Sequence, residues 1–395
     1  MKYYHYIFIL ILSTSYSYSQ SQSNKDVTIS ILTCAPGHEL YSIYGHNAIR
    51  IVNDETGSDR VYNYGTFDFN TPGFAIKFMR GKLPYLLSSV DFYDFMREYE
   101  YFHRSVTEQI LNLDSLQKQK IIKYISLNML PENREYKYDF FMDNCATRLR
   151  DIINSNVFNI NWDRGRTSHK TFRQIIKQYQ KGMPWTDFGI DLIIGSPSDK
   201  IITLSEEAFI PDYLSDAIQY AEIENNIIRP LQSKKTQILN FDHNNEMSNS
   251  IFSPWLLFIL LFLLEIVILI KYFRGETTLW VKKYDLIWVI LITLGSILLL
   301  FMWFGTDHTA TGKNFNLLWC SPLIPLIWYL DLYRSEWLRN WMIILLTIIL
   351  IICMINAIPG IQILKQYFHP LVMVITAILI FKIFRWSKIF KGINV

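Results

Sequence analysis

Hydrophobic positions are unevenly distributed along this chain of 395 residues. They crowd into residues 1–20 and 251–395, whereas residues 21–250 mix apolar and polar positions as an ordinary soluble domain does. The pattern therefore predicts three parts: a short apolar leader, a globular domain exposed to water, and a C-terminal part embedded in a membrane.

The leader has the pattern of a secretory signal peptide. Lys2 precedes an apolar run over residues 6–12, and Ser17-Tyr18-Ser19 offers small residues where a signal peptidase cleaves. The run is far shorter than the ~20 apolar residues that span a membrane, which disfavours the alternative of a permanent anchor. We therefore expect residues 1–19 to be a signal peptide and residues 20–239 to be exported.

The exported domain begins with strand patterns. Residues 27–33 alternate and are rich in β-branched side chains, which is typical of a strand. Residues 47–52 and 60–66 predict a hairpin around the turn-forming residues 53–58. This hairpin brings residues 63–66 opposite the start of its first strand.

Helical patterns follow the strands. Residues 115–128 carry an apolar stripe, with Asp114 as the N-cap. A second helix is expected to begin at Cys145, with Asp143 or Asn144 as its cap and an apolar face that comprises Leu149, Ile152 and Ile153. Residues 205–220 also have a helical pattern.

The C-terminal part predicts an all-α domain of five membrane helices. The apolar stretches are flanked by tryptophan, tyrosine and lysine, as interfacial anchors are. A polar, asparagine-rich connection, residues 240–250, is the expected linker to this domain, residues 251–395. The stretches cover about residues 255–270, 286–304, 317–332, 341–355 and 371–384.

Loop charge supports one orientation in the membrane, with the N-terminal domain exported and the C-terminus cytoplasmic. The expected cytoplasmic loops and tail carry ten basic residues, whereas the two opposite loops carry only Lys313 and Lys365, as the positive-inside rule requires. The formal charge of +3 then reflects orientation and indicates no nucleic-acid partner. The ten residues are Lys271, Arg274, Lys282, Lys283, Arg334, Arg339, Lys382, Arg385, Lys388 and Lys391.

Glu265 is a carboxylate within the first expected membrane helix. A charge at membrane depth is a functional hypothesis by default. Because Glu265 lies toward the cytoplasmic end of its helix, we expect its side chain to reach the aqueous surface instead.

Two short segments carry candidate chemistry. His46 follows Gly45 at the start of the hairpin, and Cys145 follows Asn144 at the start of a helix. Unpaired N–H groups and the helix dipole favour a thiolate at such a position. A histidine with such a thiol is the usual apparatus of a cysteine nucleophile, although each residue alone is more often structural.

The other cysteines and histidines indicate no framework and no metal. Cys320 and Cys353 fall in or beside membrane stretches, while Cys34 shares the oxidising compartment with Cys145 and offers a disulfide as the alternative to a free thiol. The histidines of the exported domain show no metal-ligand spacing, so no metal and no cofactor is expected. These histidines are His38, His103, His169 and His243.

The chain resembles the circularly permuted papain-like group that includes lecithin:retinol acyltransferase, in which the histidine strand precedes the Asn-Cys helix. More narrowly, it resembles the Bacteroides-type lipoprotein N-acyltransferases, which also have a five-helix membrane domain. The motifs that carry this likeness are Glu39–His46, Asn63–Phe69, Gly81–Tyr85 and Asp143–Thr147. The resemblance implies an α+β permuted papain-like periplasmic domain followed by an all-α domain that crosses the bacterial inner membrane several times, with a cytoplasmic C-terminus.

The resemblance also implies roles for individual residues. Cys145 is the nucleophile and His46 the base. Asn63 and Tyr64 are both candidates for the third member, because strand parity allows only one of them to face His46. Asn144 and Glu39, which stand in the shared motifs, are expected near the substrate.

An exported thiolate favours acyl transfer on physical grounds. The periplasm has no ATP or acyl-CoA, so a phospholipid is the expected acyl donor, and a thioester keeps the acyl chain activated toward an amine. The expected acceptor is the α-amino group of the diacylglyceryl-cysteine of an apolipoprotein. The polar loop of residues 305–316 lies on the same side of the membrane, and its residues Asp307, His308 and Asn314 are further candidates for substrate binding.

Two other functions remain open at this point. A membrane-tethered cysteine peptidase or amidase that acts on cell-wall or peptide substrates would use the same thiol and imidazole, since fold does not settle function. A non-catalytic binding module would retain His46 and Cys145 only as core residues. A peptidase has no need of five helices, and a binding module has no need of a capped cysteine that faces a histidine.

Overall fold

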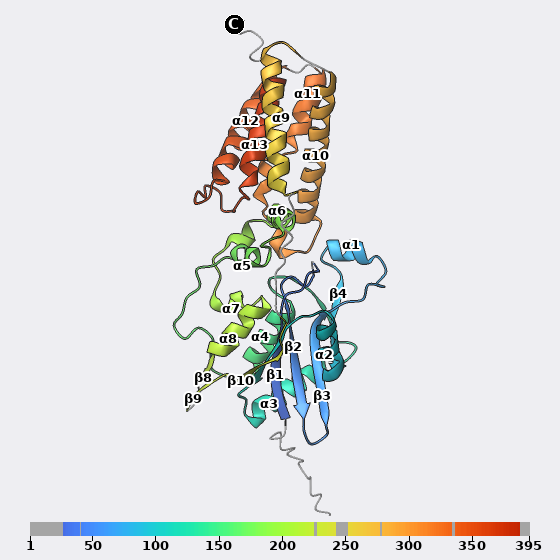
Figure 1. Ribbon diagram of the computed structural model, residues 1–395, viewed down its shortest axis with the longest axis vertical. Coiled ribbons are helices and arrows are strands. Elements are labelled where there is room, and N and C mark those ends of the chain that lie inside the picture. The colour runs from blue at the N-terminus through green and yellow to red at the C-terminus, as the bar shows by residue number, and fades with distance from the viewer. Residues whose placement is uncertain are drawn as a thin grey trace, which may run out of the picture.

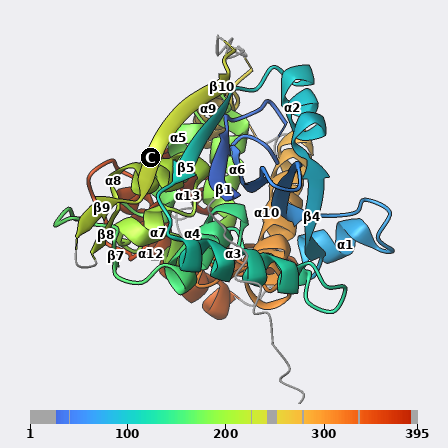
Figure 2. The ribbon, with the colours of Figure 1, turned by 90° about the horizontal axis from the view of Figure 1, so that it is seen from below.

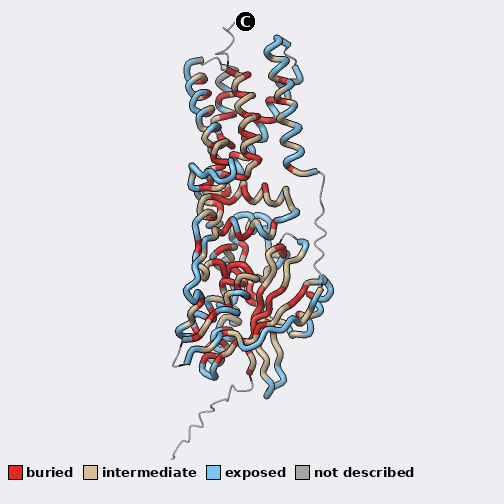
Figure 3. Tube along the Cα trace, turned by 60° about the vertical axis from the view of Figure 1, so that its left-hand side comes forward, coloured by how far each residue is buried: buried red, intermediate tan, exposed pale blue. Residues whose placement is uncertain are grey.

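The computed structural model describes residues 27–39, 41–224, 227–241, 252–276, 279–333 and 336–387. The expected signal peptide and most of the expected linker lie outside the described residues. The chain forms a sheet-containing domain and a bundle of long helices, which are stacked end to end (Figure 1). Each part has its own buried interior (Figure 3).

The N-terminal domain is built on an antiparallel sheet of seven strands in the order β10-β5-β1-β2-β3-β4-β6. The strand over residues 27–33 and the hairpin are confirmed, with Ile49 opposite Tyr62. The strands are β1 Val27–Cys34, β2 His46–Asn53, β3 Ser58–Thr66, β4 Pro84–Asp91, β5 Val106–Leu111, β6 Glu135–Lys137 and β10 Gln232–Leu239.

The helices of this domain begin at residues that cap them. Asp114 caps α3 Ser115–Asn128, and Asn144 caps α4 Cys145–Asn156, as the sequence predicts. The other elements are α1 Phe74–Met79, α2 Phe92–Tyr101, α5 Phe172–Tyr179, α6 Pro184–Ile193, η2 Ser196–Asp199, α7 Leu204–Glu207, α8 Pro211–Tyr220 and a small sheet of β7 Ile160–Asn161, β8 Glu222–Glu224 and β9 Ile228–Pro230.

The prediction of one helix over residues 205–220 is wrong. The segment forms α7 and α8, which are separated by residues 208–210. Pro211 lacks the backbone N–H that would continue a helix, and it stands instead at the first position of α8, where no such donor is needed.

The core lies between the sheet and α4. Leu149, Ile152 and Ile153 project from α4 and are at most 2% exposed, as their helical spacing predicts. They belong to the same buried cluster as Ile31 and Ile49 of the neighbouring strands. Because α4 packs against β2, the first residue of the helix is brought to the first residue of the strand.

Five helices make up the described part of the C-terminal domain: α9 Pro254–Phe273, α10 Leu279–Phe304, α11 Leu323–Tyr333, α12 Glu336–Asn356 and α13 Leu371–Trp386. By length and composition, Pro254–Phe273, Leu279–Phe304 and Trp337–Asn356 can each cross a membrane. The expected helix over residues 317–332 begins later, since residues 315–318 form a 3₁₀ turn. At ~1.5 Å per residue α11 is only about 17 Å long.

A cluster of four charged side chains is buried between α9, α10 and α13, in the half of the bundle away from the sheet. Lys382 lies 3.0 Å from Glu265 and 2.9 Å from Asp285, and Arg385 contacts both acids. The expectation that Glu265 reaches water is wrong, because Glu265 is 0% exposed. Lys382 and Arg385 therefore neutralise buried acids and do not count as cytoplasmic loop charges.

The two domains are joined by hydrogen bonds to the C-terminal end of α6. Asn314 donates from Nδ2 to the carbonyls of Leu192 and Ile193, at 2.7 and 2.9 Å, and Asn316 donates to the carbonyls of Asp191 and Leu192. The last carbonyls of a helix have no partner within it. The loop of the membrane domain therefore acts as the C-terminal cap of a helix in the periplasmic domain.

We predict that Gly195→Ala disrupts this junction. A Cβ at Gly195 would lie 2.0 Å from the carbonyl oxygen of Gly312, and overpacking of this kind costs about 1–3 kcal/mol. Gly189→Ala is the matched control, because a Cβ there meets nothing within 4 Å and lies in helix α6. Thermal unfolding in detergent should show a lower Tm for Gly195→Ala only; equal Tm values would contradict the close approach.

We also predict that Lys382→Met destabilises the bundle by about 3–5 kcal/mol, because two buried acids, Glu265 and Asp285, then share the single cation Arg385. The double variant Glu265→Gln/Lys382→Met should be less destabilised, since Asp285 and Arg385 then remain as a neutral pair. Denaturation of the four proteins of this double-mutant cycle measures the coupling. Additive effects would show that the four charges do not act as one cluster.

Candidate active site

Local backbone geometry brings His46 to the edge of the sheet. Gly45, which precedes it, has φ +80°, and a Cβ at this position would lie 2.8 Å from the carbonyl oxygen of Cys34. Glycine is the residue that tolerates both conditions. The chain thereby turns into β2 with His46 as its first residue, paired with Cys34 of β1.

Cys145 is the first residue of α4 and lies against His46. The thiol and the imidazole are close enough for each to shift the pKa of the other, and both side chains are only partly buried. Nε2 of His46 lies 3.1 Å from Oδ1 of Asn63, which leaves Nδ1 as the nitrogen that can face the thiol. Three side chains from β2, β3 and α4 therefore form one continuous array.

The surroundings favour charge separation between the thiol and the imidazole. Burial acts to raise the pKa of Cys145, but the charge and hydrogen bond of His46, with backbone N–H groups of Asn47 and Ala146, lower it below the ordinary 9.0. Burial acts to lower the pKa of His46, but the thiolate and Asn63 raise it above 6.5. Both shifts favour a thiolate and an imidazolium.

The two candidates for the third position are resolved geometrically. Asn63 faces His46, whereas Tyr64 points to the other side of β3 and is 1% exposed in the core. The Tyr64 hydroxyl has no hydrogen-bond partner, and its ring lies under Arg148. Strand alternation thus places only Asn63 in the array.

Asn144 is occupied by hydrogen bonds within the protein. Its Oδ1 accepts from the N–H groups of Ala146 and Thr147, and its Nδ2 donates to the carbonyls of Phe140 and Phe209. The side chain is therefore an N-cap that fixes Cys145 at the helix start, and it has no donor left for a substrate. Glu39 is exposed, and its carbonyl accepts from Ser42.

The loop of residues 305–316 reaches the segment that precedes Cys145. Asp307 forms an ion pair with Lys137 at 2.6 Å, and the ring of His308 lies where a Cβ on Gly81 would be 3.2 Å away. Asn314, in contrast, is 1% exposed at the domain junction. Two of the three loop candidates, Asp307 and His308, therefore lie against the sheet-containing domain, and the third, Asn314, holds the two domains together.

Sequence reasoning missed Asp139. Its Oδ1 accepts from the N–H groups of Phe141 and Met142, and its Oδ2 accepts from the Thr309 hydroxyl at 2.7 Å. Asp139 therefore orders the turn before Cys145 and ties it to the membrane-domain loop. An aspartate can form a turn by accepting from backbone N–H groups two and three residues further on, so Asp139 is a recognisable turn residue. Its partner Thr309 in the distant loop cannot be inferred from the sequence.

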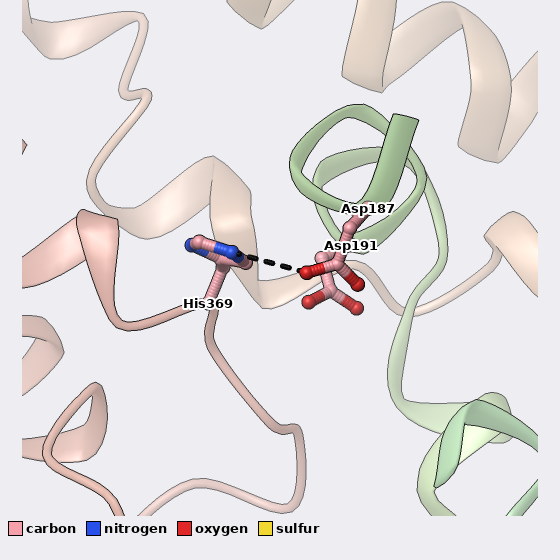
Figure 4. A group of neighbouring side chains, drawn as sticks. All are labelled: Asp187, Asp191 and His369. Atoms are coloured by element: carbon pink, nitrogen blue, oxygen red, sulfur yellow. Dashed lines mark ion pairs between the residues drawn. The ribbon is translucent and has the colours of Figure 1, made fainter. Parts of the chain in front are cut away.

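One group of residues outside the array has metal-ligand composition. Asp187, Asp191 and His369 converge at the domain junction (Figure 4). Nζ of Lys177 lies 2.7 Å from Asp187 and 2.6 Å from Asp191, and Arg173 also pairs with Asp191. These cations provide the positive charge that a metal would supply, so the group is a salt-bridge network between α5, α6 and the segment before α13.

The long apolar helices define a membrane protein. The domain docked to them holds a thiol, an imidazole and an amide side by side, which is a candidate cysteine-dependent site. Residues 15–178 match the family model of the Lnb N-terminal periplasmic domain, and residues 246–391 match that of the Lnb transmembrane domain. The chain belongs to this family, the Bacteroides-type lipoprotein N-acyltransferases, which confirms the resemblance. A search of curated proteins gave no match, and a search of solved structures gave none.

We predict that Cys145 alkylates with an apparent pKa below 9.0, and that His46→Gln raises this pKa. The reason is that the substitution removes the positive partner of the thiolate while burial remains. The measurement is the rate of iodoacetamide alkylation against pH, followed by mass spectrometry. An unchanged profile in His46→Gln would contradict the ion pair.

The same profile separates the two candidates for the third position. Asn63→Ala should slow alkylation about ten- to hundredfold near neutral pH, the factor for a lost hydrogen bond to a charged group. Tyr64→Phe is the matched control, because its hydroxyl has no partner to lose. Equal profiles for the two variants would show that Asn63 does not orient His46.

Proposed function

We propose that this protein N-acylates the α-amino group of the diacylglyceryl-cysteine of apolipoproteins, with a phospholipid as the acyl donor and a thioester on Cys145 as the intermediate. The observation that carries the proposal is the array of Cys145, His46 and Asn63. It stands on a domain docked to membrane helices in a chain of the Lnb family. No cofactor enters the reaction.

In the first half-reaction, His46 takes the proton of the Cys145 thiol, and the thiolate attacks the ester carbonyl carbon of the phospholipid. The C–S bond forms, and the carbonyl π electrons move to oxygen. When the tetrahedral intermediate collapses, the ester C–O bond breaks and the lysophospholipid leaves with the proton from His46. The acyl chain remains on Cys145.

In the second half-reaction, the α-amino group of the apolipoprotein attacks the thioester and gives a proton to His46. The C–N bond forms, the C–S bond breaks, and the thiol regains a proton from His46. Asn63 holds the imidazole so that it can exchange protons at Nδ1 in both halves. The N–H at the start of α4 offers a donor to the oxyanion, as N–H groups at helix starts do.

The remaining features of the proposal follow the same logic. Both substrates are lipids, so a permuted papain-like domain is useful only at the membrane surface, which accounts for a five-helix domain in the inner membrane with a cytoplasmic C-terminus. Asp307 and His308 lie on the loop that faces the catalytic domain and are proposed to contact a lipid head group. Their neighbours Lys137, Arg80 and Lys82 would complement its phosphate.

The test is to trap the acyl-enzyme. Protein in phospholipid vesicles without acceptor should carry a hydroxylamine-labile adduct of acyl mass on Cys145, and Cys145→Ala should lose it with at least a ~10³-fold loss of lipoprotein acylation. Cys353→Ala is the control, because this thiol is buried in the membrane domain. Cleavage of peptides that depends on Cys145, without any acyl adduct, would identify a peptidase and overturn the proposal.

A further inference from the structure

Helix α1 is unusual because it buries nothing. None of its six residues is buried, and its apolar side chains Ile76, Phe78 and Met79 are 62%, 52% and 44% exposed. Phe69, just before it, is 68% exposed. A helix this short is marginal in water without packing, so an apolar environment is required to cover this face.

The charges around α1 are those of a segment that lies in a membrane interface. Lys77, Arg80 and Lys82 stand within or just after the helix, against a single acid, Asp68, in the same stretch. A short apolar face bordered by basic residues fits the boundary between acyl chains and anionic head groups. A partner protein could also cover the apolar face of α1, but it would not account for the basic residues around that face.

The position of α1 matches that boundary. It projects from the side of the sheet domain (Figure 2) and lies near the level where α10 ends (Figure 1). Nε of Arg80 donates to the carbonyl of Gly305 at 3.4 Å, and the N–H of Asp307 donates to the carbonyl of Arg80 at 2.9 Å. The exposed Phe304, which stacks on Trp303, ends α10 beside this contact, as aromatic residues end membrane helices.

A row of aromatic rings leads inward from α1. Phe78 stacks on Phe74 at 6.1 Å between ring centroids, Phe74 lies 5.8 Å from Phe67, and Phe67 lies 5.3 Å from Tyr85. Tyr85 then stacks on Tyr138 at 4.4 Å. The row runs from an exposed ring at Phe78 to the 7% exposed Tyr85.

The inner end of this row is at the nucleophile. Tyr138 immediately precedes Asp139, whose backbone pairs with Asp143 in both directions at 3.0 and 2.9 Å. This closed turn delivers the chain directly to Asn144 and Cys145, and Tyr138 is close enough to Cys145 for their charges to interact. Packed rings therefore lead from the apolar face at the membrane edge to the turn that ends at Asn144 and Cys145.

We propose that α1 dips into the outer leaflet of the lipid bilayer, and that the row of Phe78, Phe74, Phe67, Tyr85 and Tyr138 guides a phospholipid acyl chain from there to Cys145. The second part rests on the proposed function, whereas the first part does not. Along this row an acyl chain would remain in contact with aromatic rings from α1 to Tyr138 and would not have to cross water.

The first part is tested by photocrosslinking in full-length protein. A benzophenone amino acid at position 78 should label phospholipids in vesicles of phosphatidylethanolamine and phosphatidylglycerol. The matched control is position 93, because Tyr93 is an aromatic residue that is 71% exposed. It lies two residues after the end of β4, where Asp91 pairs with Arg60, far along the hairpin from His46. We expect at least about tenfold more lipid adduct at position 78; equal labelling, or adducts to a second copy of the chain, would overturn the proposal.

The second part is tested by comparing two acyl donors. Phe78→Asp and Phe67→Ala should slow acylation of Cys145 from phospholipid vesicles about tenfold or more, the factor for one apolar side chain lost from lipid contact. Acylation from water-soluble 4-nitrophenyl acetate should be unchanged. Tyr93→Asp serves as the control for an added surface charge.

Each outcome separates the two proposals. Equal slowing with both donors would show that the variants disturb the site itself and would overturn the aromatic path. Absence of a Cys145 adduct with both donors in the unmodified protein would refute the proposed function, and the crosslinking result would still decide whether α1 enters the lipid.

Discussion

The rest of the site depends on the hydrogen bonds of the Asn144 side chain. Its oxygen closes the first turn of α4, and its nitrogen binds the turn before the helix and the carbonyl of Phe209 before α8. One amide therefore fixes where the helix starts, from which direction the chain arrives, and how a second layer packs on it. Because α4 is also packed on β2 through its buried face, the helix start can lie only at the strand start. The contact between Cys145 and His46 is a consequence of this geometry.

The same segment also meets the membrane domain. Asp139 accepts from Thr309 while it orders the turn that ends at Asn144, and Asn314 and Asn316 cap α6 from the same loop. Hydrogen bonds of this kind are directional, so they fix orientation as well as proximity. A domain tethered only by a linker could present any face to the bilayer. Here the loop makes the end of the sheet that carries His46 the end that faces the membrane helices (Figure 1).

Local patterns in the sequence were sufficient for most of the elements and for the expectation that Cys145 and His46 lie together. Alternation over β1 to β3 and the caps Asp114 and Asn144 predict the strands and helices correctly, because those signals lie within a few residues of what they determine. The choice between Asn63 and Tyr64 needed only the register of the hairpin. The failures concern distant partners. The helical spacing of residues 205–220 concealed the break at Pro211, and the charge on Glu265 gave no sign of Lys382 and Arg385 far along the chain. The role of Asn314 as a cap for α6 is invisible for the same reason.

Two networks of ion pairs lie at different levels of the described helices, and both bear on how the periplasmic domain is held. At one level, the network of Arg173, Lys177 and their acids joins α5 and α6 to the segment before α13. At the other, the cluster around Lys382 ties α9, α10 and α13 together in the half of the bundle away from the sheet. Between these levels the helices present mainly apolar side chains. A buried ion pair adds little net stability, but it is costly to separate. The helices are therefore resistant to sliding relative to one another, and the loop between α10 and α11 keeps a fixed position relative to the bundle. That constancy matters because the loop supports both the turn before Cys145 and the backbone of Arg80 after α1.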